Sequence, residues 1–300
     1  MIKVRSADIW RVRIPLRVEV KHALASRRES ENVVVKLVLD DGSAGYGECV
    51  PREYVTGETA DSAIAALTGV LLPTLRGHAF SDYGDVTVFL QDCEVSGAAK
   101  CAFELALIDA VTCRCEAGAH EIIGPPLRSS VHYTAVIPAV SAERFEQIAT
   151  NVQLQQFRDV KIKVGAGDDD AERLKVFRRI AGEAPNVRVD ANGAWDPDTA
   201  LSHISRLQKY GISSVEQPIP ARDIDGLAYV ASRSPVPICV DESLVTVRDA
   251  QELISRQACH IFNLRLSKCG GLLNCLQLAE LARQAGMRYQ IGCQVGETGI

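Results

Sequence analysis

The sequence predicts an α/β protein in which an α+β domain, residues 1–125, precedes an α/β barrel, residues 126–300. Two observations support this. In the first region strand-like runs come first and helical runs follow, an order typical of α+β domains. From about residue 130 strand-like and helical runs alternate, which indicates parallel strands joined by helices. Seven such strands in succession favour a barrel over an open doubly wound sheet.

In the first region, three predicted strands are followed by two predicted helices. The strands occupy residues 3–16 and 32–49, and the helices occupy residues 59–73 and 97–114. Asp40-Asp41-Gly42 is a hairpin turn between the last two strands. Residues 17–31 and 51–58 are polar and without hydrophobic period, so we predict loops there. Because binding residues often lie on variable loops held by a rigid scaffold, we expect these two loops to determine substrate specificity.

The second region repeats one strand–helix unit. Its predicted strands are residues 131–138, 157–165, 187–193, 213–218, 237–243, 260–268 and 288–296. Predicted helices between them include residues 171–182, 197–211 and 273–286. Such units place all the carboxyl ends of the strands at one end of the barrel, where active sites of this architecture lie.

Composition excludes several classes of protein. The 300 residues carry a net charge of −5 with basic residues spread along the chain, which is unlike a nucleic-acid-binding surface. No apolar run approaches the length of a membrane span, and residues 1–10 lack the apolar stretch of a signal peptide, so we expect no export signal. The ten cysteines mostly fall inside periodic elements, so we expect reduced thiols. We therefore expect a cytoplasmic homo-oligomer with neither nucleic acid nor membrane as a partner.

Charged residues recur where successive barrel strands end, 25 to 29 residues apart from Lys163 onward. They are Lys161, Lys163, Asp190, Glu216, Asp241, Lys268 and Glu297. Taken singly, each acid has an ordinary structural role as a turn or helix-capping residue. Their recurrence at the same end of successive units instead predicts one cluster at the barrel mouth.

Three carboxylates on adjacent strands provide oxygen ligands for a hard divalent cation, Mg²⁺ or alternatively Mn²⁺. The three acids and a dication sum to −1, and three lysines, one of them neutral, add +2. The resulting charge of about +1 suits a small-molecule carboxylate substrate. A lysine base must be neutral near pH 7, and a neighbouring cation and burial both lower a lysine pKa. We therefore expect Lys163 to be the base, and Lys161 to tune it and bind the substrate carboxylate.

The motifs "KIK", "VDANGAW", "EQP", "DES" and "LSKCGG" occur in order, and with them the sequence resembles the enolase superfamily, specifically its muconate-lactonising subgroup. The resemblance implies a modified, TIM-like (β/α)7β barrel beneath an α+β capping domain. It also implies Mg²⁺ bound by Asp190, Glu216 and Asp241, and acid/base roles for Lys163 and Lys268, as in the magnesium and lysine chemistry general to this superfamily. Asn192 is expected to support the metal site.

Two features depart from the family pattern. The seventh strand lacks a histidine, which argues against a mandelate-racemase-like site, and it is followed by Gly296-Glu297-Thr298 where relatives often have Glu-Ser. The resemblance also implies a further helix, an eighth strand and a C-terminal segment after Ile300. We therefore expect the sequence to be part of a longer chain.

The leading functional prediction is a racemase or epimerase that removes a proton α to a carboxylate through an enediolate. A dipeptide or N-acyl amino acid is the expected substrate, because the stretch "PREYVTGET" resembles that of dipeptide epimerases. Arg52, Tyr54 and Glu297 are the predicted substrate-binding residues. Cycloisomerisation or β-elimination through the same enediolate is the alternative, and a metal-binding relative without activity is a third.

Overall fold

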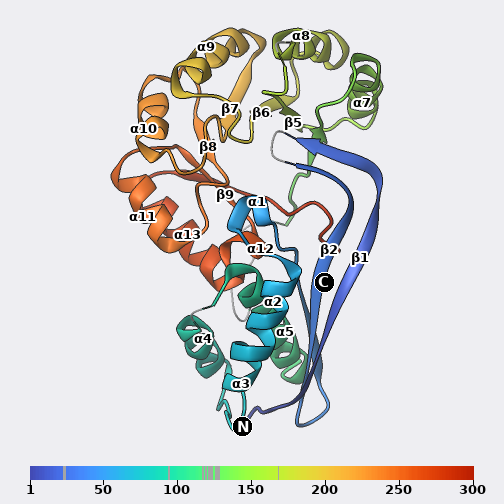
Figure 1. The fold of residues 1–300 in the computed structure, drawn as a ribbon, viewed down its shortest axis with the longest axis vertical. Helices are drawn as coiled ribbons and strands as arrows, with labels where there is room; N and C mark the ends of the chain where they lie inside the picture. The colour runs from blue at the N-terminus through green and yellow to red at the C-terminus, as the bar shows by residue number, and fades with distance from the viewer. Residues whose placement is uncertain are drawn as a thin grey trace.

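The computed structural model describes residues 1–22, 25–93, 95–116, 118, 120, 124–125, 129–167 and 169–300. These residues form two sheets, each with helices and a hydrophobic core of its own (Figure 1). We call the first body the cap and the second the barrel region. The predicted boundary at residues 125/126 adjoins residues 126–128, which lie outside the described part of the chain, and stays a prediction.

The cap contains an antiparallel sheet in the order β1 (Val4–His22), β2 (Ala25–Leu39) and β3 (Ala44–Cys49). The predicted hairpin between β2 and β3 is confirmed, and Gly42 at its turn has a φ of 94°. The sheet packs closely on helix α5 (Gly97–Arg114). A Cβ at Gly47 would lie 2.0 Å from the carbonyl oxygen of Ala102, so only glycine permits this approach.

The remaining cap helices are short, and all except α1 pack on the same core. They are α1 (Glu53–Thr56), α2 (Ala60–Ala66), a π-helical turn (Leu67–Leu71), α3 (Leu72–Thr74) and α4 (Tyr83–Asp92). Thr59 and Ser62 form a capping box that starts α2, as the predicted start at residue 59 requires. The predicted loop at residues 51–58 contains α1, a single turn too short to give a periodic signal.

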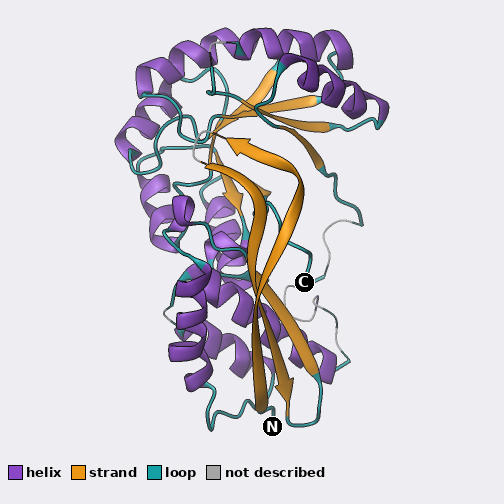
Figure 2. Cartoon of the chain, turned by 45° about the vertical axis from the view of Figure 1, so that its right-hand side comes forward, coloured by secondary structure: helices purple, strands orange, loops and turns teal. Residues whose placement is uncertain are grey.

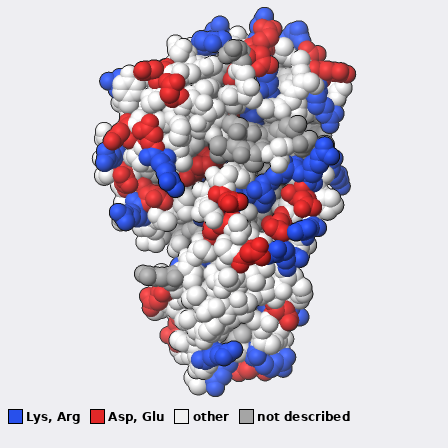
Figure 3. Space-filling model, in the orientation of Figure 1, with Lys and Arg blue, Asp and Glu red and all other residues white. Residues whose placement is uncertain are grey.

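The predicted loop at residues 17–31 is wrong for residues 17–22 and 25–31, whereas residues 23–24 lie outside the described part of the chain. Strands β1 and β2 extend into these residues, with pairs such as Val20 and Arg27, so the two strands form a long ribbon that curves from the cap to the barrel region (Figure 2). Backbone hydrogen bonds join the strands whatever their side chains, and exposed pairs such as Arg13–Glu31 replace apolar alternation. Figure 3 shows basic and acidic side chains interspersed along this side of the molecule.

The barrel region is a curled sheet of seven parallel strands, so the predicted fold class, a TIM-like barrel with an N-terminal cap, is confirmed. The strands are β4 (Thr134–Ile137), β5 (Asp159–Lys163), β6 (Asn186–Asp190), β7 (Ile212–Glu216), β8 (Ile238–Val240), β9 (Ile261–Leu264) and β10 (Arg288–Ile291). They lie side by side in chain order, with β4 and β10 at the two edges of the sheet.

Helices cover the outer face of the curled sheet (Figure 1). They are α7 (Ala142–Leu154), α8 (Asp170–Ala181), α9 (Pro197–Leu207), α10 (Ile224–Arg233), α11 (Val247–Ser255) and α13 (Leu272–Gln284). A further single turn, α12 (Leu266–Cys269), follows β9 and packs against α5 of the cap. In the described part of the chain no helix combines the length and apolarity needed to cross a membrane.

Candidate active site at the strand ends

The strand register brings the predicted acids together. Lys163 at the end of β5 pairs with Asp190 of β6, and Asp190 pairs with Glu216 of β7. Asp241 follows β8 directly. Asp190 and Asp241 are fully buried and Glu216 is nearly so. Burying three carboxylates is costly unless cations and donors surround them.

Lysines from β5 supply two of those cations. Lys161 Nζ lies 3.1 Å from Asp190 Oδ2 and 3.0 Å from Glu216 Oε1. Lys163 Nζ donates to Asp190 Oδ2 and to Asn192 Oδ1, at 2.6 Å each. Asn192 lies two residues beyond the end of β6 and has a positive φ of 46°. The paired lysines of "KIK" thus face the acids, on the same side of β5.

The three acids and the lysines that contact them form a cluster that we call the ring, with members Asp190, Glu216, Asp241, Lys161, Lys163 and Lys268. Lys268 approaches it from the side of Asp241. Its Nζ lies 2.9 Å from Asp241 Oδ1, and it also donates to the backbone oxygens of Asp241 and Asn263. Lys268 belongs to α12 and not to the end of strand β9 as predicted. Helix α12 follows β9, which lies four strands from β5 in the sheet, so the two predicted acid/base residues approach the ring from well-separated elements.

Arg265 is a member of the ring that sequence reasoning missed. Its guanidinium contacts Asp241 Oδ2, lies 3.9 Å from Glu216 Oε1, and donates to Gln294 Oε1 at 3.0 Å. Asn263, two residues earlier, donates to Glu216 at 3.2 Å. The alternation of Asn263 and Arg265 at the end of β9 was the available signal, because alternate strand residues share one face.

Glu242 was also missed, although it lies inside the "DES" motif. Its Oε1 accepts a hydrogen bond of 2.9 Å from Asn192 Nδ2, and its buried Oε2 has no hydrogen-bond partner. Burial and the neighbouring Asp241 raise the pKa of Glu242 to about 7. Asn192 therefore joins two parts of the site, the Lys163 ammonium and the Glu242 carboxyl.

Burial and charged neighbours shift the pKa values of the ring residues in different directions. Burial would raise the pKa of Asp190, but Lys161 and Lys163 lower it below its ordinary value. Burial and then Asp190 raise the pKa of Glu216. Burial would lower the pKa of Lys268, but Asp241 raises it. The raised pKa of Lys268 is opposite to the lowered value expected of a lysine base, and the adjacent carboxylate is the cause.

The donor set fits a hard divalent cation by its chemistry. Three buried carboxylates provide six oxygens, the ligand type that Mg²⁺ prefers. Neighbouring acids already share a cationic group. Lys161 lies between Asp190 and Glu216, and Arg265 lies between Glu216 and Asp241. As the side chains lie in this structure, however, no group of three or more His, Cys, Asp or Glu residues among the described residues is arranged to hold a metal ion, and this includes these three acids. The assignment of these residues as metal ligands stays a prediction.

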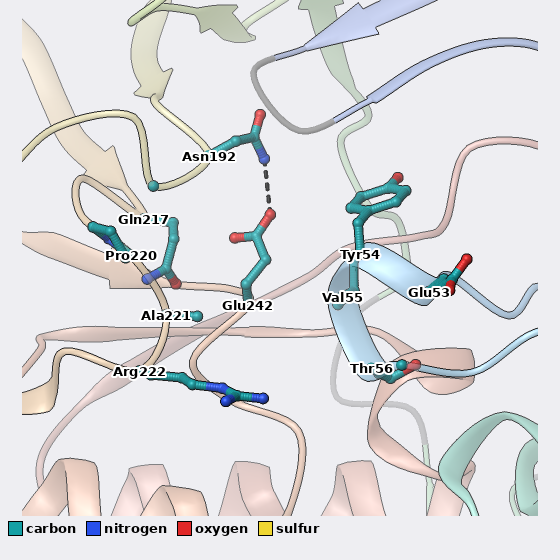
Figure 4. A pocket seen from close by; sticks show the side chains of 12 residues that line it. Glu53, Tyr54, Val55, Thr56, Asn192, Gln217, Pro220, Ala221, Arg222 and Glu242 are labelled. Atoms are coloured by element: carbon teal, nitrogen blue, oxygen red, sulfur yellow. Dashed lines mark hydrogen bonds between the residues drawn. The ribbon is translucent and has the colours of Figure 1, made fainter.

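A pocket of about 430 Å³ lies beside the ring, between the cap and the barrel loops (Figure 4). Tyr54 and Glu53 of α1 line one side, and Asn192, Glu242 and Arg222 line the other. Of the predicted substrate-binding residues, Tyr54 thus lies at a cavity wall. The guanidinium of Arg27 lies 5.1 Å from the centre of the Tyr54 ring and stacks on its face.

Arg52 and Glu297 are not among the residues that line this pocket. Arg52 is 2% exposed and donates to the backbone oxygen of Val295 at 2.5 Å. Glu297 follows β10, and burial raises its pKa to about 6. The Oε1 of Glu297 is buried without a hydrogen-bond partner.

Comparison with known proteins agrees with this geometry. A family model described as the enolase C-terminal domain-like family matches residues 143–300. The model of the mandelate racemase/muconate lactonizing enzyme N-terminal domain matches residues 4–124. The chain belongs to the mandelate racemase/muconate lactonizing enzyme family of the enolase superfamily. The resemblance carried by the strand-end motifs is therefore confirmed.

Members of this family similar to the chain are isomerases. The L-Ala-D/L-Glu epimerase of Bacillus subtilis is 30% identical over 98% of this chain and 81% of its own length. Its substrate-liganded structure superposes with a TM-score of 0.91 over 99% of this chain and 83% of that one. The dipeptide epimerase of Enterococcus faecalis V583, solved with Mg and L-Leu-L-Tyr, is 27% identical with a TM-score of 0.90, over 98% and 83%. Muconate cycloisomerase 1 of Rhodococcus opacus is 31% identical over 95% and 78%.

Proposed function

We propose that this protein is a racemase or epimerase that exchanges the proton α to the carboxylate of a dipeptide or N-acyl amino acid. One observation carries the proposal: Lys163 at the end of β5 and Lys268 of α12, the helix that follows β9, reach a single carboxylate ring from well-separated elements. Two amines on opposite sides of one carbon allow a proton to leave one face and return to the other. The epimerase relatives in Bacillus subtilis and Enterococcus faecalis support the substrate class.

The residues of the chain divide the work. Lys161 and Arg265 provide positive charge for the substrate carboxylate. One of Lys163 and Lys268 takes the α-proton, which leaves an enediolate, and the other donates a proton to the opposite face. Asn192 and Asp190 hold the Lys163 ammonium, and the backbone oxygens of Asp241 and Asn263 hold that of Lys268. Cations placed where negative charge develops stabilise the transition state.

Mg²⁺ is the proposed cofactor, with Asp190, Glu216 and Asp241 as the residues that would hold it. When bound there, it would add positive charge at the enediolate oxygens. The dipeptide epimerase complex with Mg supports this choice. Mn²⁺ stays a prediction, as do the homo-oligomeric state and the cytoplasmic location. Elemental analysis and light scattering would address the first two.

The test is deuterium incorporation at the α-carbon in deuterated water, followed by NMR. The panel contains L-Ala-L-Glu, L-Leu-L-Tyr and N-acetyl-L-leucine, each with Mg²⁺. We expect exchange and formation of the epimer for at least one member. Absence of exchange across a broader panel of dipeptides and N-acyl amino acids, by a folded protein that binds Mg²⁺, would overturn the proposal.

Cycloisomerisation is the second candidate, and the similarity to the muconate cycloisomerase supports it. The same ring would stabilise an enediolate, but one lysine would do all the proton transfer. Loss of the ultraviolet absorbance of cis,cis-muconate, with no α-proton exchange in any dipeptide, would favour this reaction. A β-eliminating activity would instead release a leaving group detectable by mass spectrometry.

A further inference from the structure

A buried polar cluster in the cap forms hydrogen bonds with the loop that follows β10. Its cap members are Ser30, Asn32, Glu48 and Arg52, of which Glu48, at 5%, is the most exposed. Its partners are the backbone of residues 295–298 and the Thr298 hydroxyl. We call this cluster the latch. Most buried polar groups in proteins are hydrogen-bonded, and each of these four is.

The contacts of the latch cross from cap to barrel region. Arg52 Nη2 donates to Val295 O at 2.5 Å, and Asn32 Nδ2 donates to Gly296 O at 2.8 Å. Glu48 accepts from the Thr298 N–H at 2.8 Å and from the Thr298 hydroxyl at 3.0 Å. Hydrogen bonds to charged groups are stronger than neutral ones, and two of these side chains are charged.

Ser30 packs so closely against Gly296 that position 296 has no room for a side chain. Gly296 has a φ of 99°, and a Cβ there would lie 2.2 Å from Ser30 Oγ and 2.3 Å from Ser30 Cβ. Ser30 Oγ in turn accepts from Arg52 at 3.2 Å and donates to Asn32 at 2.5 Å. A side chain at position 296 would therefore displace the serine on which the latch is built.

The loop is also held from the barrel side. Arg265, which contacts Asp241, donates to Gln294 Oε1 at 3.0 Å, and the Glu297 N–H donates to Gln294 O at 3.1 Å. Glu297 thus lies between an anchor on the ring and an anchor on the cap. Burial lowers the pKa of Arg52, and the nearby Glu297 carboxylate opposes this shift. Burial raises the pKa of Glu297, and the charges of Arg265 and Arg52 oppose that shift.

We propose that Arg52, with Ser30 and Gly296, is a positioning device that fixes the loop carrying Glu297 at the mouth of the active site. This inference rests on the proposed function, because it assigns substrate affinity to a loop at the proposed site. Arg52 acts through Val295 and its neighbours and need not touch the substrate. The latch contacts neither Lys163 nor Lys268, so it governs binding and leaves proton transfer unchanged.

Amide hydrogen exchange tests the latch without any substrate. Arg52→Gln and Gly296→Ala are expected to accelerate exchange at residues 294–298 on the order of tenfold, the effect of losing a hydrogen bond to a charged group. Gly299→Ala is the matched control, since Gly299 has a φ of 90° but no neighbour within 4 Å of a Cβ. It carries the same backbone strain without the clash. Unchanged exchange at residues 294–298 in both latch variants would overturn the proposal.

Kinetics on the dipeptide that the wild type exchanges best provides the second arm. Arg52→Gln and Gly296→Ala are expected to raise KM on the order of tenfold with kcat little changed, and Arg52→Lys to recover part of the loss. A merely structural defect would lower kcat per total enzyme at constant KM, which would overturn the positioning role. Gly296→Ala removes no side chain, so it separates positioning from direct contact between Arg52 and substrate. If the wild type exchanges neither a dipeptide nor an N-acyl amino acid, the proposed function fails while hydrogen exchange still decides the latch.

Discussion

Asp190 and Glu216 share one cation, since Lys161 Nζ lies within 3.1 Å of an oxygen of each. Two carboxylates whose oxygens lie this close to the same ammonium nitrogen can also coordinate one divalent cation. We expect Glu216→Gln to weaken Mg²⁺ binding, measured by calorimetry, by at least the roughly 10- to 100-fold seen for supporting partners of metal ligands. Glu172→Gln, an exposed acid paired with Lys175, is the control. Full turnover after exhaustive chelation, with no metal found by elemental analysis, would contradict the assignment.

The two lysines should be separable by stereochemistry. Lys163→Ala should stop α-proton exchange from one stereoisomer in deuterated water, and Lys268→Ala should stop it from the other. Either change should abolish epimerisation, because general acid/base groups contribute about 10²–10⁴-fold and both faces are needed. If both variants lose exchange of the same stereoisomer and keep the other, a one-base mechanism replaces the two-base one.

Tyr54 should influence substrate choice, since it forms a wall of the pocket beside the ring. Tyr54→Ala is expected to change the ratio of kcat/KM between L-Leu-L-Tyr and L-Ala-L-Glu, on the scale of the about 1–3 kcal/mol by which one methylene changes discrimination in a hydrophobic pocket. Tyr229→Ala is the matched control, because Tyr229 is on α10 and does not line the pocket. An equal ratio in all three proteins would exclude Tyr54 from recognition.

Glu104 on α5 should make folding stability depend on pH. Its carboxylate accepts from the Leu273 N–H at the start of α13, and burial raises its pKa from 4.5 to about 7. Between these values the folded protein keeps a proton that the unfolded chain has lost, so stability falls as pH rises through this window. The loss amounts to about 3 kcal/mol at 1.36 kcal/mol per unit.

Replacing the Glu104 carboxyl tests whether it causes the loss of folding stability as pH rises. Glu104→Gln keeps an acceptor for Leu273 but cannot ionise, so its free energy of unfolding should fall less than that of the wild type between pH 5 and pH 8. Denaturant unfolding at a series of pH values is the measurement. A variant that loses as much stability as the wild type over this range would show that Glu104 is not responsible.

Two glycines of the cap should respond oppositely to alanine. Gly47→Ala would place a Cβ 2.0 Å from Ala102 O and should destabilise the cap by roughly 1–3 kcal/mol or more, the cost of overpacking. Gly69→Ala meets no atom within 4 Å and should be neutral or stabilising by about 0.4–1 kcal/mol. Thermal unfolding of both variants checks the pair, and equal melting temperatures would contradict the close packing of β3 on α5.

The ring was predictable because a strand–helix unit has a nearly constant length, so residues about 25 apart in sequence become neighbours in space. Lys163, Asp190 and Glu216 are register partners for that reason. The β1–β2 ribbon was not predictable from hydrophobic period, since it is charged where a half-buried strand would alternate. Arg52 was assigned to the substrate because it is charged and lies in a loop. Its partner Val295 is 243 residues away, and nothing local to either residue relates them.

All ten cysteines are free, and they differ sharply in exposure. Cys113, Cys115 and Cys293 are exposed, whereas six cysteines are buried. Of these, Cys49 and Cys101 lie in the cap core, Cys259, Cys269 and Cys275 lie in the barrel core, and Cys239 lies in neither. Burial raises the pKa of Cys259 to about 12, so this thiol is protected from alkylation both sterically and by its protonation. The number of thiols alkylated per molecule, counted by mass spectrometry, therefore reports directly how much of each core has opened.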